Sequence, residues 1–315
     1  YALDANTTGD FNTAVGMHAL GANTTADNNT AVGKDALAAN TTGTLNTAVG
    51  AVALDALTTG DYNTAVGGAA LGQATDGDYN TAFGYAAGAA ITTGVQNVLI
   101  GGESGDALTD ADFNVGIGTS ALGSDTKGNR NVAIGHGSLV TQNFTSSTSV
   151  YNTAVGYNAG NAVTTGVSNT FVGGLAGDGT DDGALNVAVG ASALSANCAN
   201  SNTAVGVTAL VVTTGANNTA LGYQAGASVT SGSNNLFVGK DAGLTGSPGG
   251  AITTGSNEIV LGDENISEAH IQVDWTVASD ARDKTDFTVL DLGLDFVKAL
   301  APVTYKWDKR SKYGD

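Results

Sequence analysis

A short motif recurs through most of this 315-residue chain at an almost constant spacing. The pentapeptide Asn-Thr-Ala-Val-Gly begins at Asn12, and identical or closely similar copies begin at every seventeenth position after it as far as Asn131. Further copies follow at nearly the same step, beginning at Asn152, Asn169, Asn186, Asn202, Asn218 and Asn235, with a weaker copy at Asn257. A fixed period sustained over about 250 residues is the signature of a repeat array, so we expect stacked repeats over this length.

Each position of the repeat has its own chemistry when the asparagine is numbered 0. Positions 1 and 3 are mostly Thr, Val or a larger apolar residue, whereas position 2 is mostly Ala or Gly. Such alternation is typical of a short strand, and the Gly that occupies position 4 in all fourteen regular copies suits a turn with positive φ. Two helices do not fit into so short a repeat, because each helix alone needs about 10 or more residues. The sequence therefore predicts an all-β, parallel β-solenoid with two short strands and two turns in each coil.

Stacking of the coils defines the expected dimensions and the role of the asparagines. Parallel ladders are spaced about 4.8 Å apart, so about fifteen coils give a rod on the order of 70 Å. The asparagine of each coil would then lie above that of the next. We expect this column to form a ladder that hydrogen-bonds the turn backbones.

The apolar content of the chain is unusually small in volume. Aromatic residues make up 6% and charged residues 13% of the sequence, so Ala, Val and Leu must supply a thin core. Position 7 is Ala or Ser in all fourteen regular copies, as at Ala19, Ala36, Ala53, Ser104, Ser138 and Ala242. A column of small side chains permits close backbone approach. We therefore expect this column to be the interface of a homotrimer, with a dimer as the alternative.

Charge and hydropathy exclude several classes of protein. The net charge of −18 argues against nucleic-acid binding, which needs a basic surface. No long apolar run of the kind that spans a bilayer is present, so we expect no membrane insertion, and the N-terminus lacks the pattern of a signal peptide. The single Cys198 excludes an intrachain disulfide framework and is expected to be inert. No motif implies a cofactor.

The chain changes character after Gly262. Before residue 279 there are 4 basic and 22 acidic residues, whereas from 279 onward there are 7 of each, and both tryptophans lie near the C-terminus. We expect a shaft over 1–262, a connecting strand over 263–278, and a small α+β segment over 279–315. In that segment Asp286 or Thr288 caps a helix that ends before Pro302.

Coils such as Asn131-Val-Ala-Ile-Gly and Asn114-Val-Gly-Ile-Gly resemble the head repeats of YadA-like trimeric autotransporter adhesins, and similar arrays occur in phage tail fibres. The resemblance covers residues 1 to about 262. It implies left-handed parallel β-rolls that assemble as trimers.

A second resemblance covers the C-terminal segment. Ser279-Asp-Ala-Arg-Asp-Lys284, then Leu292 to Leu300, and then Pro302-Val-Thr-Tyr-Lys-Trp are similar to the start of the intramolecular chaperone domain of endosialidase-type tailspikes, the S74 peptidase family. The family implies a domain that helps a β-rich trimer fold and then cleaves itself off beside the motif serine. Ser279 would be the nucleophile and Lys284 its base. The alternative is a permanent trimeric cap without cleavage, and in neither case do we expect an enzyme that acts on other substrates.

Other candidate sites are weaker. His18, His136 and His270 are too scattered for a metal triad, and Asp178, Asp181 and Asp182 are either a calcium-binding loop or a solvated acidic turn. No recurrent pair of carboxylates suggests glycoside cleavage. The repeated Thr-Thr-Gly turns favour a flat ice-binding array only weakly, because the turn sequences vary.

Two coils carry insertions, Thr141 to Tyr151 and Asp241 to Gly250. Insertions in solenoids become loops on one face, often the binding face. Phe144 and Tyr151 would be able to stack on a sugar ring, although an insertion without function is the simpler interpretation.

Together these features favour a phage tail fibre. Its distal shaft would be attached to the virion through other tail proteins before residue 1, and would present a surface to a host-cell receptor, such as a glycan. The alternative is a bacterial surface adhesin or extracellular filament built from the same coils.

Overall fold

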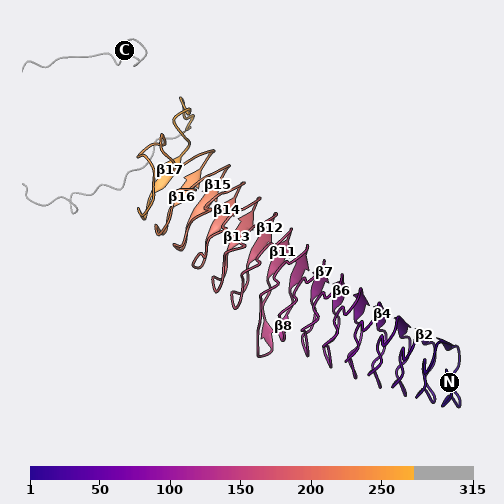
Figure 1. The fold of residues 1–315 in the computed structure, drawn as a ribbon. Coiled ribbons are helices and arrows are strands. Elements are labelled where there is room, and N and C mark those ends of the chain that lie inside the picture. The colour runs from indigo at the N-terminus through magenta and orange to yellow at the C-terminus, as the bar shows by residue number, and fades with distance from the viewer. Residues whose placement is uncertain (273–315) are drawn as a thin grey trace, which may run out of the picture. The chain divides into compact units, whose positions relative to one another are not determined.

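The computed structural model describes residues 1–272 and shows a stack of similar coils (Figure 1). Each coil contributes one three-residue strand to a 15-stranded sheet in which every neighbouring pair described is parallel. The strands follow chain order from β1 to β17, except that β8 and β10 form a separate two-stranded sheet. The residues from 1 to 272 contain no helix. The prediction of an all-β parallel solenoid is therefore confirmed.

The strands have the following bounds: β1 (Thr13–Val15), β2 (Thr30–Val32), β3 (Thr47–Val49), β4 (Thr64–Val66), β5 (Thr81–Phe83), β6 (Val98–Ile100), β7 (Val115–Ile117), β8 (Gly128–Asn129), β9 (Val132–Ile134), β10 (Thr148–Ser149), β11 (Thr153–Val155), β12 (Thr170–Val172), β13 (Val187–Val189), β14 (Thr203–Val205), β15 (Thr219–Leu221), β16 (Leu236–Val238) and β17 (Ile259–Leu261).

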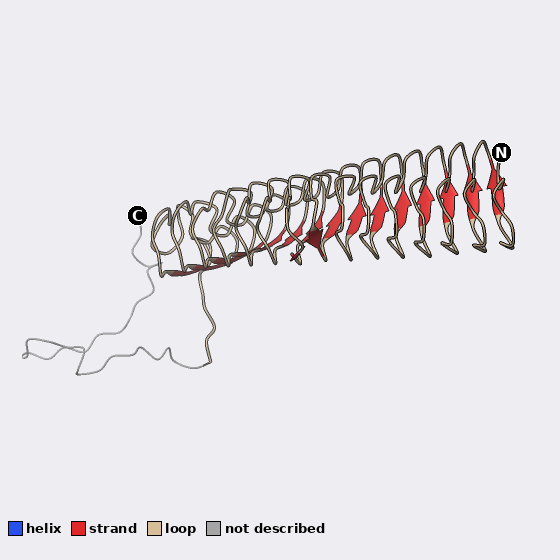
Figure 2. Cartoon of the chain, turned by 90° about the horizontal axis from the view of Figure 1, so that it is seen from below, coloured by secondary structure: helices blue, strands red, loops and turns tan. Residues whose placement is uncertain are grey.

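The constant period of the sequence sets the register of the sheet. Thr13 pairs with Thr30 and Ala14 pairs with Ala31, so each repeat position lies beside the same position of the next coil. The strands follow one side of the stack along its length (Figure 2). Although the step from Asn131 to Asn152 is longer than the usual one, β9 still pairs with β11, because the added residues leave the coil as an insertion.

Each regular coil has one strand instead of the two that the sequence predicts. The segment after the position-4 glycine winds through turns, because positions 6 and 8 adopt positive φ although most are not glycine, as at Asp35 (φ 57) and Leu37 (φ 50). The backbone still bonds from coil to coil there, with the Leu37 N–H donating to the Ala53 carbonyl at 3.0 Å. Stacking bonds therefore replace a second sheet.

The small residues of the repeat lie inside the coil and the bulky ones outside. In β2, Ala31 at position 2 is 0% exposed, whereas Val32 at position 3 is 36% exposed. The position-7 column is also buried within the single chain, with Ala36 and Ser104 at 0%. The prediction that position 7 forms the interface between chains is therefore wrong, because a coil this narrow needs its smallest side chains to fill its own interior.

At position 2, the side chains of Leu99, Phe171 and Phe237 are larger than the usual Ala and lie beside glycines at position 8. Most coils bury Leu at position 8, but Phe171 occupies position 2 of its coil, and both Gly160 and Gly177 stand at position 8 beside it. A Cβ at Gly160 or Gly177 would lie 2.9 or 2.5 Å from the Phe171 ring. Leu99 is flanked in the same way by Gly88 and Gly105, and Phe237 by Gly226 and Gly243.

The asparagine ladder forms as predicted. Asn46 is fully buried, its amide donates to the Gly60 carbonyl at 2.7 Å, and its side-chain oxygen accepts the Asn63 N–H at 2.9 Å. Both polar groups of the buried amide are thus paired. The same pair of bonds repeats along most of the stack and holds the corner that precedes each strand.

Candidate functional site

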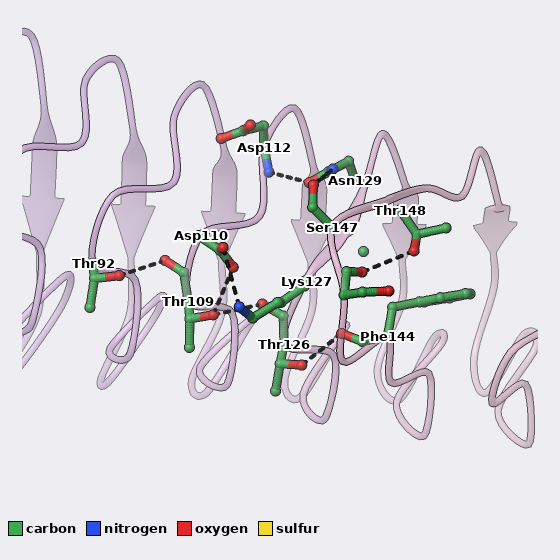
Figure 3. Close-up of polar contacts among 12 residues, drawn as sticks. Thr92, Thr109, Asp110, Asp112, Thr126, Lys127, Asn129, Phe144, Ser147 and Thr148 are labelled. Carbon is green, nitrogen blue, oxygen red and sulfur yellow. Dashed lines mark hydrogen bonds and ion pairs between the residues drawn. The ribbon is translucent and has the colours of Figure 1, made fainter.

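The insertion between the Asn131 and Asn152 coils is an ordered extension of the solenoid wall. Its strand β10 pairs in parallel with β8 of the preceding coil, and the Val150 N–H donates to the Asn129 carbonyl at 3.0 Å. The Asn129 amide donates to the Ser147 hydroxyl at 3.0 Å, and the Thr126 hydroxyl donates to the Phe144 carbonyl at 2.7 Å (Figure 3). The expectation of a loop on one face is met by a segment with its own hydrogen bonding.

Asp125 anchors this insertion from within the coil. Its carboxylate is fully buried and accepts the backbone N–H groups of Gly128 at 3.1 Å and Phe144 at 3.0 Å, together with the Gln142 amide at 2.5 Å. Burial is the largest influence on this group and raises its pKa, while the hydrogen bonds oppose the rise. The Gln142 oxygen in turn accepts from the Asn152 amide at 2.8 Å. This buried polar network ties the insertion to the coils on both sides.

The two predicted contact residues of the insertion have different environments. Phe144 is only 9% exposed, so its ring is buried in the insertion and is not available to stack on a sugar in solution. The prediction for Phe144 is therefore wrong. Tyr151 is 56% exposed and lies at position −1, the corner just before a strand. Its φ of 58° is shared by other residues of this corner column, including Tyr62 and Phe113.

The corner column is an exposed ridge with aromatic character in the N-terminal two thirds of the solenoid. Tyr62 and Tyr79 stack with ring centroids 4.8 Å apart. Further along, the guanidinium of Arg130 lies 5.0 Å from the Phe113 ring centroid and 5.8 Å from that of Tyr151. The register of the coils therefore places a cation between two aromatic rings, which is a favourable arrangement.

Arg130 and Lys127 are cations that the sequence analysis did not single out. Arg130 donates to the Ser149 hydroxyl at 2.7 Å. Lys127 pairs with Asp110 at 3.3 Å, as Figure 3 shows. The sequence contained a signal for them, because they are two of only four basic residues before residue 279 and both lie in the coil before the Thr141 to Tyr151 insertion.

The outer face of the large sheet is a second candidate surface. Position 3 carries exposed apolar side chains along the stack, among them Val15 at 59% and Phe83 at 58%. Position 5 adds exposed residues such as Tyr85, Tyr157 and Tyr223. These columns run beside one another on one side of the described chain.

The remaining candidates gain little from the structure. In residues 1–272 no group of three or more His, Cys, Asp or Glu side chains is placed to hold a metal ion, so the calcium interpretation of Asp178, Asp181 and Asp182 has no geometric support. Among the same residues no helix has the length and apolar character needed to cross a bilayer. Cys198 is buried, which raises its thiol pKa.

The threonine turns are arranged as a ladder that leaves few hydroxyls free. The Thr92 hydroxyl donates to the Thr109 carbonyl at 3.2 Å, and the Thr109 hydroxyl to the Thr126 carbonyl at 3.1 Å. Because these hydroxyls are engaged by the backbone of the next coil, the ladder is a stacking device.

The C-terminal segment is assigned by comparison with known families. Residues 279–315 match the family model of the chaperone of endosialidase, Peptidase_S74. The predicted likeness to this chaperone family is thus confirmed for that segment. The match covers only the C-terminal end of the chain, so it assigns no family to the solenoid. No curated protein matches the chain. Ser279 and Lys284 open the chaperone match but lie outside the residues that the structure describes, as do the expected helix and most of the expected connecting strand.

Proposed function

We propose that the chain is the shaft of a homotrimeric extracellular fibre, in keeping with a phage tail fibre that contacts a host-cell receptor. The observation that carries this proposal is the exposed apolar face of the large sheet, with Val15, Val49, Phe83 and Ile100 in one column. A contiguous apolar surface of this length is rare on soluble monomers and is typical of an interface. The chaperone match supports the same assignment, since that family serves the folding of β-rich trimers.

In this proposal, two further copies of the same chain pack against this face of the sheet. Apolar residues continue around one corner of the sheet at position 5, as at Tyr85 and Tyr157. In a ring of three parallel chains, this corner of each sheet packs against the next sheet, so the columns at positions 3 and 5 are covered and the corner column at position −1 stays exposed. A two-fold dimer would cover the central column and leave the position-5 corner exposed.

Sedimentation analysis of the purified protein tests this arrangement. We expect a particle of three chain masses. Val49→Glu and Ile100→Glu place charges on the central column and should shift the particle to single chains, because a buried unpaired charge is costly. Thr42→Glu, at an exposed turn position away from the sheet, is the matched control and should remain trimeric. Trimers that persist in both sheet variants would contradict the proposal.

Self-cleavage beside Ser279 is the second part of the proposal. It rests on the chaperone match and on the need of a serine nucleophile for a neighbouring base, which Lys284 supplies by family resemblance. The denatured mass of the product of the full gene should correspond to a chain that ends beside Ser279, and Ser279→Ala should give the uncleaved mass with trimers still formed. An uncleaved wild-type product would identify the segment as a permanent cap.

A further inference from the structure

The acidic character of the solenoid is interrupted around the Thr141 to Tyr151 insertion. Residues 126–177 contain no Asp or Glu, although 22 acidic residues precede residue 279. The same stretch contains Lys127 and Arg130. At its N-terminal border Asp125 is fully buried, and Asp110 is paired with Lys127. About three successive coils therefore present a surface with cations and almost no free carboxylate.

Arg130 is at the centre of this surface, and its guanidinium is fixed by contacts with neighbouring side chains. It is exposed and forms no ion pair with any carboxylate in residues 1–272. The nearby Asp112 carboxylate accepts the Val95 N–H at 2.8 Å on the preceding coil. Phe113 and Tyr151 flank the guanidinium, and one of its five N–H donors is used by Ser149. Donors remain for an anionic ligand, at a guanidinium whose position is already fixed.

The insertion adds hydroxyl groups next to this cation. The exposed residues Thr145, Ser146, Ser147 and Ser149 lie on the segment that Asp125 anchors, and Thr148 bonds its hydroxyl to the Ser146 carbonyl at 2.9 Å. Hydroxyl side chains can donate to and accept from the hydroxyls of a sugar. Because the insertion is hydrogen-bonded along its length, little conformational entropy is lost on binding.

We propose that this surface, formed by Lys127, Arg130, Tyr151 and the exposed hydroxyls of residues 145–149, binds a carboxylate-bearing polysaccharide. The guanidinium would pair with sugar carboxylates, for which its planar fork is well suited. Tyr151 would contact the apolar face of a sugar ring. The proposal rests on the proposed function, because it names the class of receptor that the fibre contacts, and three copies in one trimer would raise the avidity.

Binding to three immobilised polymers, measured by surface plasmon resonance, tests the proposal. Carboxymethyl-dextran should bind the purified protein, whereas unmodified dextran, which lacks the charge, and polyglutamate, which lacks the sugar, should bind at least tenfold more weakly. Equal binding to dextran would overturn the role of the carboxylate. Equal binding to polyglutamate would overturn recognition of a saccharide.

Matched variants locate the site. Arg130→Gln should weaken binding to carboxymethyl-dextran roughly tenfold, the loss expected for a charge-assisted hydrogen bond, and Lys127→Gln should weaken it less. Lys34→Gln removes an exposed cation that already pairs with Asp35 at 2.7 Å in an acidic part of the solenoid, and should leave binding unchanged. If Lys34→Gln weakens binding as much as Arg130→Gln, the proposed surface is wrong. Sedimentation of the same samples shows separately whether the trimer proposal holds.

Discussion

The side-chain oxygen of Asn46 accepts the backbone N–H of Asn63 at 2.9 Å, one coil further along the chain. Asn63 repeats the relationship with Asn80 at the same distance. Each of these asparagines also donates its amide hydrogen to the carbonyl of a glycine in the next turn of the chain, which for Asn63 is Gly77 at 2.7 Å. One side chain thus fixes both the spacing of two coils and the path of the turn between them.

Asn63→Asp should therefore destabilise the stack although it preserves the shape of the side chain. The variant keeps the acceptor for Asn80 but faces the Gly77 carbonyl with an oxygen in place of a donor. We expect a loss of about 1–3 kcal/mol at neutral pH, read from urea unfolding, with partial recovery at acid pH where the neutral carboxyl can donate. Asn28→Asp is the control, because it changes an exposed corner residue, and it should alter the midpoint of urea unfolding little. Equal losses in the two variants would show that the ladder bond is unimportant.

Phe171 and its two flanking glycines should behave as one unit. Phe171→Ala leaves a cavity and should cost about 3–5 kcal/mol, whereas Gly177→Leu alone drives a side chain into the phenyl ring. The triple variant Phe171→Ala, Gly160→Leu, Gly177→Leu recreates the arrangement of the other coils, in which Leu at position 8 already adopts φ near 50°. Its melting temperature should recover most of the loss, and losses that simply add would contradict the coupling.

Two adjacent glycines provide a test of close backbone stacking. Gly101 has φ of 132°, and a Cβ there would lie 2.6 Å from the Gly118 carbonyl, whereas a Cβ on Gly102 would meet nothing within 4 Å. Gly101→Ala should cost roughly 2–4 kcal/mol because it combines strain with overpacking. Gly102→Ala should leave thermal unfolding nearly unchanged. A Gly102 variant as unstable as the Gly101 variant would require a different account of the turn.

Asp125 should give the stack a pH dependence of known sign. Burial raises its folded-state pKa above the unfolded value, so the folded chain holds the proton more tightly. The contribution of Asp125 to stability is therefore fully present at low pH and is lost as pH rises through the folded pKa. Asp125→Asn removes this titration. The unfolding midpoint of the wild type, measured relative to that of the variant, should rise as pH falls from 7 to about 4, and a constant difference would contradict the assignment.

The period, the parallel sheet and the asparagine ladder were predictable because each depends on residue identity at a fixed spacing. Which face of the strand lies inside was not predictable from β2 alone. Ala31 and Val32 alternate as in any strand, and the usual rule places the larger residue in the core. The narrow coil reverses this rule, and its width is set by turns at residues such as Leu37, whose positive φ is uncommon for a non-glycine residue.

The candidate site was predicted only in part. An insertion with exposed Tyr151 was expected, but the burial of Phe144 follows from its bond to Asp125, a contact between two segments that only the folded insertion brings together. The pairing of Arg130 with Phe113 and Tyr151 likewise depends on the corner column, which appears only once the coils are stacked.

The coil-to-coil bond of Asn46 to Asn63 has a consequence for how such a shaft changes length. Because most coils make the same asparagine bonds to their neighbours, duplication or deletion of one regular repeat would leave the junctions between the remaining coils nearly unchanged. Unequal recombination between near-identical repeats would therefore lengthen or shorten the rod by about 4.8 Å at a time without any compensating mutation. The length of the stack can thus be inherited independently of the sequence of the insertion.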